Sequence, residues 1–327
     1  MNRREFSQML TFAGLANIMP STTSAKESTS SMYEVPDFGH ARLLHMTDSH
    51  AQLMPIYFRE PAVNIGVATE NGKPPHIVGQ NFLDYFDIKT GSISAHALTS
   101  LDFVAGAQQF GKVGGYAHLC TLVKQLRQNY GDDDRSLLLD GGDTWQGSAT
   151  AYWTRGKDMV EASNILGVDV MTGHWEFTYQ DEEILENIAE FNGEFIAHNV
   201  KVDETALFDG AQAYDEDEGY AFKPYTIKTM GEHRVAIIGQ AFPYTPIANP
   251  SRFIPDWTFG IQSQELQNLI DRIRGDESPD AVILLSHNGM DVDLKLAATV
   301  TGIDVILGGH THDGIPQPIH VKNASGT

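Results

Sequence analysis

Five short segments of the chain carry residue types that bind divalent metal ions, and each closely follows a short apolar run. They are Asp48-Ser49-His50, Gly142-Asp143, Gly173-His174, Ser286-His287 and Gly309-His310-Thr311-His312. One such segment alone is more often a hydrogen-bonded part of the core than a ligand, but five in the same context favour a metal site. Carboxylate oxygens and imidazole nitrogens without a thiolate suit Mn, Fe or Zn ions and exclude an iron–sulfur cluster.

The number of candidate ligands predicts two ions rather than one. Two Asp and five His side chains are too many for one tetrahedral ion, but with one shared carboxylate they fit two ions about 3.5–4 Å apart. Two divalent ions bring four positive charges, whereas Asp48, Asp143 and a bridging hydroxide supply three negative ones. The centre therefore stays positive and can hold an anionic tetrahedral group. This chemistry is suited to attack of a metal-activated hydroxide on an oxyanion ester.

Short apolar strands alternate with helical patterns along the chain, which is typical of an α/β fold. Strands are predicted at 41–47, 136–140, 168–171, 194–200, 225–230, 234–239, 281–286 and 305–307, and helices at 115–128, 159–166, 181–191, 265–274 and 292–299. Loops at the carboxyl ends of parallel strands meet in one crevice, so the seven candidate ligands are expected to converge there. Residues 55–110 are predicted to be a long irregular insertion.

The ordered set of segments resembles the calcineurin-like dimetal phosphoesterases, and specifically their 5′-nucleotidase branch. The resemblance covers roughly residues 40–315 and implies an α/β fold that is a four-layer α/β/β/α sandwich. Carried over by position, it implies that Asp143 bridges two ions. One ion would be held by Asp48, His50, Asp143 and His312, and the other by Asp143, His174, His287 and His310.

One departure from that family concerns the leaving group. The family's Gly-Asn-His-Glu-Phe-Asp is here Gly-His-Trp-Glu-Phe-Thr, at residues 173–178. His174 replaces one neutral ligand by another, whereas Trp175 and Thr178 replace the His and Asp that supply a general acid. A thiolate leaves more easily than an alkoxide because the pKa of a thiol is about 8.5. The loss of the acid therefore favours cleavage of a bond to sulfur.

Residues 140–147 and 173–179 are also similar to the SoxB family of thiosulfohydrolases, from bacterial sulfur oxidation. This resemblance implies a dimanganese centre, with Zn or Fe as alternatives, that releases sulfate from a cysteine S-thiosulfonate on a sulfur-carrier protein. It gives Asp143, Trp175 and Tyr179 as catalytic candidates, and Tyr179 either orients the sulfonate or is a packed aromatic. The alternatives are a periplasmic 5′-nucleotidase or cyclic phosphodiesterase, and a non-catalytic metal-binding or carrier-docking protein.

The start of the chain resembles a twin-arginine export signal. Arg3-Arg4 precede a mildly apolar stretch and small residues that end near Ala25. We therefore expect residues 1–25 to direct a periplasmic location, and residues 26–327 to form the catalytic domain. The SoxB family has a further C-terminal substrate-binding domain, so the sequence is interpreted as an N-terminal fragment.

The composition excludes several other classes. Lys and Arg number 22 against 43 Asp and Glu, which gives a net charge of −21 and disfavours nucleic acid and anionic lipid as partners. No run of eighteen apolar residues is present, so a transmembrane helix is not expected. The single cysteine, Cys120, excludes an intrachain disulfide and is predicted to be buried. The other eight histidines, His198 among them, lack a comparable placement and are predicted not to be ligands.

Overall fold

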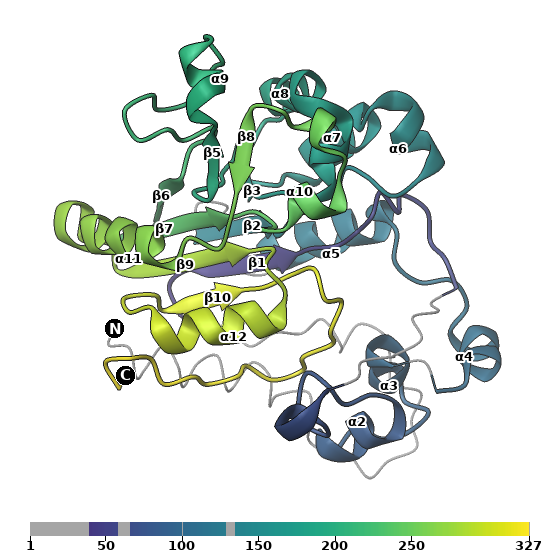
Figure 1. The fold of residues 1–327 in the computed structure, drawn as a ribbon. Coiled ribbons are helices and arrows are strands. Elements are labelled where there is room, and N and C mark those ends of the chain that lie inside the picture. The colour runs from purple at the N-terminus through teal and green to yellow at the C-terminus, as the bar shows by residue number, and fades with distance from the viewer. Residues whose placement is uncertain (1–38, 58–65, 100, 129–134, 327) are drawn as a thin grey trace. The chain divides into compact units, whose positions relative to one another are not determined.

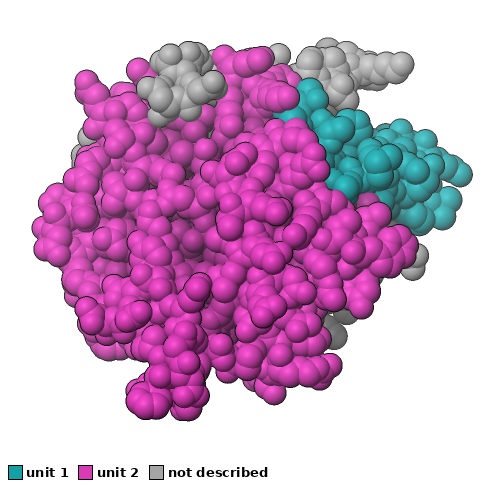
Figure 2. All heavy atoms as spheres, turned by 90° about the horizontal axis from the view of Figure 1, so that it is seen from above, with its two compact units in different colours: residues 1–39, 53–122, 313–320 teal, residues 40–52, 123–312, 321–327 magenta. Residues whose placement is uncertain are grey.

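The computed structural model describes residues 39–57, 66–99, 101–128 and 135–326. The predicted export signal lies outside the described residues. The chain divides into two compact units, which Figure 2 distinguishes by colour: residues 1–39, 53–122 and 313–320 form the first, and residues 40–52, 123–312 and 321–327 the second. Every candidate metal ligand belongs to the second unit.

The second unit contains two four-stranded sheets (Figure 1). The first is entirely parallel and runs in the order β1 (Arg42–Met46), β2 (Ser136–Asp140), β3 (Val170–Met171), β4 (Glu194–Phe195). The second runs in the order β10 (Val305–Leu307), β9 (Ala281–Ser286), β7 (His233–Gln240), β6 (Tyr225–Met230), and only β6 at its edge is antiparallel. A short antiparallel pair joins β5 (Val200–Val202) to β8 (Trp257–Phe259).

Strand β7 shows how side-chain alternation builds the layers. Val235 and Ile237 pack in one core cluster with Leu139 of the first sheet, so this cluster fills the space between the two sheets. Ala236 and Ile238 pack in another cluster with residues of α11 (Ser263–Arg272) and α12 (Met290–Thr299). Those two helices therefore cover the outer face of the second sheet.

Helices α7 (Lys157–Leu166) and α8 (Gln180–Glu190) lie on the opposite side of the sheets from α12 (Figure 1). Each turns a buried face inward, with Met159 and Val160 on α7 and Ile184 on α8. The order of layers is helix, sheet, sheet, helix. The predicted four-layer α/β/β/α sandwich is confirmed.

The prediction of an irregular insertion at residues 55–110 is wrong. This stretch belongs to the first unit and contains three short helices, α2 (Gly79–Tyr85), α3 (Ile93–Leu98) and α4 (Phe103–Phe110), with a 3₁₀ turn at Ala68–Glu70. The side chains of Ser92 and Asp102 cap α3 and α4 by accepting backbone N–H groups at 3.1 and 3.0 Å. Phe82 and Leu83 of α2 pack with Ala95 of α3 in a small core. Helices this short show too few turns for a hydrophobic period to be seen.

The remaining predicted elements are present with shifted ends. Helix α5 spans Tyr116–Gln128, and α11 continues as a π-helical turn at Ile273–Glu277. The strand predicted at 194–200 is divided into β4 and β5, and the short helices α6 (Ala149–Thr154), α9 (Glu204–Phe208) and α10 (Thr245–Ala248) were not predicted. Cys120 is half-buried rather than fully buried. In the described part of the chain, no helix combines the length and the apolar character needed to cross a membrane.

Candidate metal centre

All seven predicted ligands meet at the carboxyl ends of the parallel strands. They form two groups, and the potential ligand atoms within each group lie within 4.8 Å of one another. The first group is buried for the most part, and the second is more open. The buried group is Asp143, His174, His287 and His310, and the open group is Asp48, His50 and His312.

The loops that present the ligands have an unusual backbone. Five of the seven ligands have a positive φ, in the left-handed region that non-glycine residues seldom adopt. They are Asp48 (53°), His50 (46°), Asp143 (57°), His310 (80°) and His312 (54°). Two backbone bonds hold the first two loops together, from the Asp48 N–H to the Gly142 carbonyl at 2.9 Å and from the His50 N–H to the Asp143 carbonyl at 2.7 Å. Such strain persists only where surrounding contacts fix it, and it is concentrated at functional sites.

The buried group is built around one carboxylate oxygen. Oδ2 of Asp143 lies 3.0 Å from Nδ1 of His174 and 3.0 Å from Nε2 of His287. Nδ1 of His287 donates to the Gly141 carbonyl at 2.7 Å, so Nε2 of the neutral ring carries a lone pair directed at the carboxylate. Two acceptors at this distance need a cation between them. The donor set therefore fits a divalent metal ion.

Without a metal, a proton takes the place of that cation. Burial lowers the pKa of His287, but the bond and the charge of Asp143, with Asp48 and the Gly141 carbonyl, together outweigh it and raise the pKa to about 9. Burial alone would raise the pKa of Asp143, yet its bonds with His174 and His287 hold it far below the usual range. Burial and the neighbouring His287 and His174 lower the pKa of His310 to about 4. Its ring is therefore neutral at pH 7 and can offer a nitrogen lone pair to a metal ion. The carboxylate is thus ionised and ready to bind a cation.

The open group lies beside the buried one. Nε2 of His312 is 3.0 Å from Nε2 of His50 and 3.1 Å from Oδ1 of Asp48. Burial would raise the pKa of Asp48, but its bonds with His312, Thr47 and the His310 backbone, together with the nearby His287, lower it to about 2. The His50 and His312 side chains are 32% and 38% exposed, whereas His174 is almost fully buried. This group is the solvent-exposed part of the centre.

Asp143 connects the two groups. Its Oδ2 lies 3.8 Å from Nε2 of His50 as well as against the two histidines of the buried group. The centroid of the Phe242 ring lies 4.1 Å from the ring centroids of both His174 and His310. An apolar side chain therefore covers the buried group. The arrangement accommodates one ion in a dry position and one in an open position, with Asp143 between them.

Glu176 is a residue of the site whose role the sequence did not reveal. It is fully buried, and its carboxylate accepts four backbone N–H groups. Oε1 accepts from Thr144 at 2.7 Å and Trp145 at 3.0 Å, and Oε2 accepts from His174 at 2.8 Å and Asp143 at 3.3 Å. The carboxylate thus fixes the Asp143 loop to the His174 loop. The only signal was an acidic residue between two aromatic ones, two residues after the ligand His174.

The residues that distinguish this chain from the dimetal phosphoesterases surround the same loop. The backbone N–H of Trp175 donates to Oδ1 of Asp143 at 2.9 Å, and its ring lies 4.8 Å from that of His174. The Thr178 hydroxyl donates to Oδ1 of Asn249 at 3.3 Å. Neither an indole nor a hydroxyl can serve as a general acid near neutral pH.

Tyr179 lies in the core rather than in the open part of the site. It is 1% exposed, and its hydroxyl donates to the Trp145 carbonyl at 2.9 Å. Burial, with a contribution from Glu176, raises its pKa. Its position favours the packing interpretation over contact with substrate. His198 is likewise buried outside both ligand groups; its Nε2 bonds to Oε1 of Gln240, and burial lowers its pKa to about 4.

Comparison with known proteins places this geometry in context. No family model matches the chain. It is 35% identical to the sulfate thiohydrolase SoxB of Thermus thermophilus, whose structure superposes with a TM-score of 0.80 over 90% of this chain and 53% of that chain. It is 32% identical over 203 residues to bovine 5′-nucleotidase, which is 61% of this chain and 33% of the bovine protein. The calcineurin-like phosphoesterase YfkN of Bacillus subtilis shares the fold, with a TM-score of 0.56 at 18% identity over 85% of this chain and 74% of that one.

The fold is that of the calcineurin-like phosphoesterases, and the paired ligand groups fit a centre of two metal ions. Within that class the chain is similar both to SoxB and to the 5′-nucleotidases. It spans about half the length of the SoxB chain and about a third of the length of the bovine 5′-nucleotidase.

Proposed function

We propose that the chain is the metal-binding domain of a thiosulfohydrolase that releases sulfate from a cysteine S-thiosulfonate on a sulfur-carrier protein. The observation that carries the proposal is that Trp175, which contacts Asp143 and His174, and Thr178, which bonds to Asn249, stand at the positions where the 5′-nucleotidase pattern has a general acid. The 35% identity to SoxB supports the same reaction.

The proposed ligands have distinct roles. Asp143, His174, His287 and His310 would hold one divalent ion, and Asp48, His50, His312 and Asp143 the other. When bound, two such ions, Mn²⁺ first and Zn²⁺ or Fe²⁺ as alternatives, supply positive charge to an oxyanion and make water a stronger acid. Phe242 and Trp175 keep water from the buried side, and the sulfonate approaches over the exposed His50 and His312.

The leaving group explains why this site needs no acid. Water provides the oxygen that bonds to the sulfonate sulfur, and the S–S bond breaks with its electron pair going to the carrier sulfur. That sulfur leaves as a stabilised anion, since even a simple thiol has a pKa of about 8.5. Phosphomonoester hydrolysis instead leaves an alkoxide, which gains far more from a proton donor.

The experiment that tests this function restores the missing acid. In full-length protein, Trp175→His combined with Thr178→Asp should raise AMP hydrolysis by up to about 10²–10⁴-fold and change sulfate release little. Metal content is measured in the same preparations, because a new histidine beside His174 can also bind an ion. The thiosulfohydrolase assignment is wrong if metal-loaded wild type hydrolyses AMP efficiently and leaves the thiosulfonate intact.

A second candidate is a periplasmic 5′-nucleotidase or cyclic phosphodiesterase that works without the dyad, and the 32% identity to bovine 5′-nucleotidase favours it. A non-catalytic metal-binding or carrier-docking protein is a weaker candidate, because all seven ligand positions are filled.

We also propose export by the twin-arginine route. The receptor reads the guanidinium pair of Arg3 and Arg4. Arg3→Lys with Arg4→Lys should therefore retain folded, metal-loaded protein in the cytoplasm. Cell fractionation checks this, and an unchanged periplasmic yield would show that residues 1–25 are not such a signal.

A further inference from the structure

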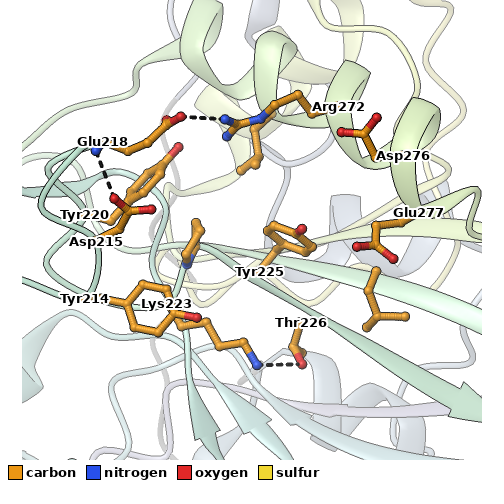
Figure 3. Close-up of a pocket in the computed structure, with 13 residues that line it drawn as sticks. Tyr214, Asp215, Glu218, Tyr220, Lys223, Tyr225, Thr226, Arg272, Asp276 and Glu277 are labelled. Atoms are coloured by element: carbon orange, nitrogen blue, oxygen red, sulfur yellow. Dashed lines mark hydrogen bonds and ion pairs between the residues drawn. The ribbon is translucent and has the colours of Figure 1, made fainter.

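A cavity of about 550 Å³ lies outside the metal centre and contains none of its seven ligands. Its lining comes from the 214–220 loop, the first residues of β6, the end of α11 and the π-helical turn at Ile273–Glu277 (Figure 3). Ile227 and Tyr225 of β6 pack against the same core as Leu269 of α11, so the floor of the cavity rests on that core. The volume is that of a small-molecule site.

The ion pairs of the lining residues leave an excess of negative charge in the cavity. Arg272 is held by Glu218 at 2.6 Å, and Lys223 by Glu194. Glu277 is in turn paired with Arg234 at 2.7 Å. Both cations of the lining therefore have carboxylate partners, although Glu194 is shared with Lys228, and the lining itself carries four carboxylates against these two cations.

Two carboxylates remain uncompensated. Asp215 accepts the backbone N–H of Glu218 at 3.0 Å, and within the described residues neither Asp215 nor Asp276 is paired with a lysine or arginine. Figure 3 shows Asp215 and Asp276 on opposite sides of the cavity, with Tyr225 between them. The π-helical turn that carries Asp276 is a geometry often found at functional sites.

Aromatic rings complete the lining. Tyr214, Tyr220 and Tyr225 all face the cavity. Burial raises the pKa of Tyr220 and of Tyr225, and so do the nearby acids Glu218 and Glu277 respectively, so both phenols stay neutral. Nζ of Lys201 lies 3.4 Å from the centroid of the Tyr220 ring, so this ring already meets a cation of the chain itself, and Tyr214 and Tyr225 are the rings that a ligand would meet. Rings of this kind attract cations through their quadrupole.

We propose that this cavity binds an organic cation, with an ammonium or guanidinium group held by Asp215, Asp276 and the tyrosine rings. The proposal is independent of the reaction at the metal centre. The negative charge of the whole chain draws such a ligand toward the surface.

Calorimetric titration of the metal-loaded chain with agmatine tests the proposal, with 1,4-butanediol as a neutral probe of similar length. We expect agmatine to bind, the diol not to bind, and affinity to fall with salt. Asp276→Asn should weaken agmatine about tenfold or more, and Tyr225→Ala should also weaken it, whereas Tyr225→Phe should not. Asp217→Asn is the matched control, because it removes the same charge from the 214–220 loop outside the lining and should change affinity less than about twofold.

The outcomes distinguish specific binding in the cavity from non-specific attraction of a cation to an acidic protein. Equal effects of Asp276→Asn and Asp217→Asn, equal binding of diol and agmatine, or no binding of agmatine and of a Gly-Arg-Gly peptide would each overturn the proposal. Tighter binding of agmatine than of the peptide assigns the site to a free small molecule. Tighter binding of the peptide assigns it to a basic side chain of a partner protein.

Discussion

Replacing Glu176 by Gln should lower the stability of the folded protein, although the two side chains have nearly the same size. One carboxylate oxygen becomes an NH₂ group, which cannot accept a hydrogen bond. Whichever oxygen is replaced, two backbone N–H groups lose their acceptor: those of Thr144 and Trp145, or those of Asp143 and His174. Each buried donor left unpaired costs about 1–3 kcal/mol, so the variant should lose about 2–6 kcal/mol of stability.

The assay is urea unfolding in the presence of a chelator, because bound metal would add its own stabilisation to the folded state. Glu186→Gln is the matched control. It makes the same chemical change on α8, where Glu186 pairs with Lys157 at 3.1 Å and both side chains are exposed. Exposed ion pairs contribute little, so this control should unfold close to wild type.

Elemental analysis gives a second measurement on the same variant. The carboxylate of Glu176 positions both Asp143 and His174, so Glu176→Gln should weaken the buried ion more than the open one. A variant that unfolds within about 1 kcal/mol of wild type would refute the reasoning, because the N–H groups would then have found other acceptors.

The remaining predictions concern metal content and acid stability. Asp143→Ala should reduce both ions, whereas His50→Ala should reduce only the open one, which a chelator should also remove first; elemental analysis that shows a single ion, or full loading of the Asp143 variant, would contradict the bridged centre. Burial would raise the pKa of Glu194, but Lys223 and Lys228 lower it from 4.5 to about 2. Its contribution to stability is therefore complete above pH 4.5 and is lost as the pH falls toward 2. Glu194→Gln should flatten this part of the pH–stability curve, and an unchanged acid transition would count against the ion pair.

The ligands could be predicted because two regularities coincide at them. Parallel strands end at one edge of a sheet, and residues such as Asp48 and His287 directly follow apolar runs that form strands in any context. The presence of Asp and His side chains at these positions then indicated binding of divalent metal ions. Neither step required knowledge of how the loops meet.

The role of Glu176 could not be predicted, because it depends on how the loops meet. The four backbone N–H groups that donate to its carboxylate come from two loops that approach each other only in the folded chain. The division of the strand at 194–200 has a similar cause. The Asn199 amide donates to the carbonyls of Ala241 and Gly260, which draws the chain out of the first sheet after Phe195. The cavity beside Tyr225 is also assembled from distant segments, and its residues carry no local pattern.

The left-handed backbone at five ligands has a consequence for how this chain tolerates the loss of its metal. A non-glycine residue in this conformation costs of order 1–3 kcal/mol, whereas glycine adopts it readily. Without ions, glycine at position 50 or 312 relaxes the loops, and the metal-free protein becomes more stable as it becomes less able to bind metal. Selection for stability alone would thus erode the centre, and only the loaded state favours Asp and His at these positions. The strained loops tie the persistence of these side chains to a continuous supply of metal.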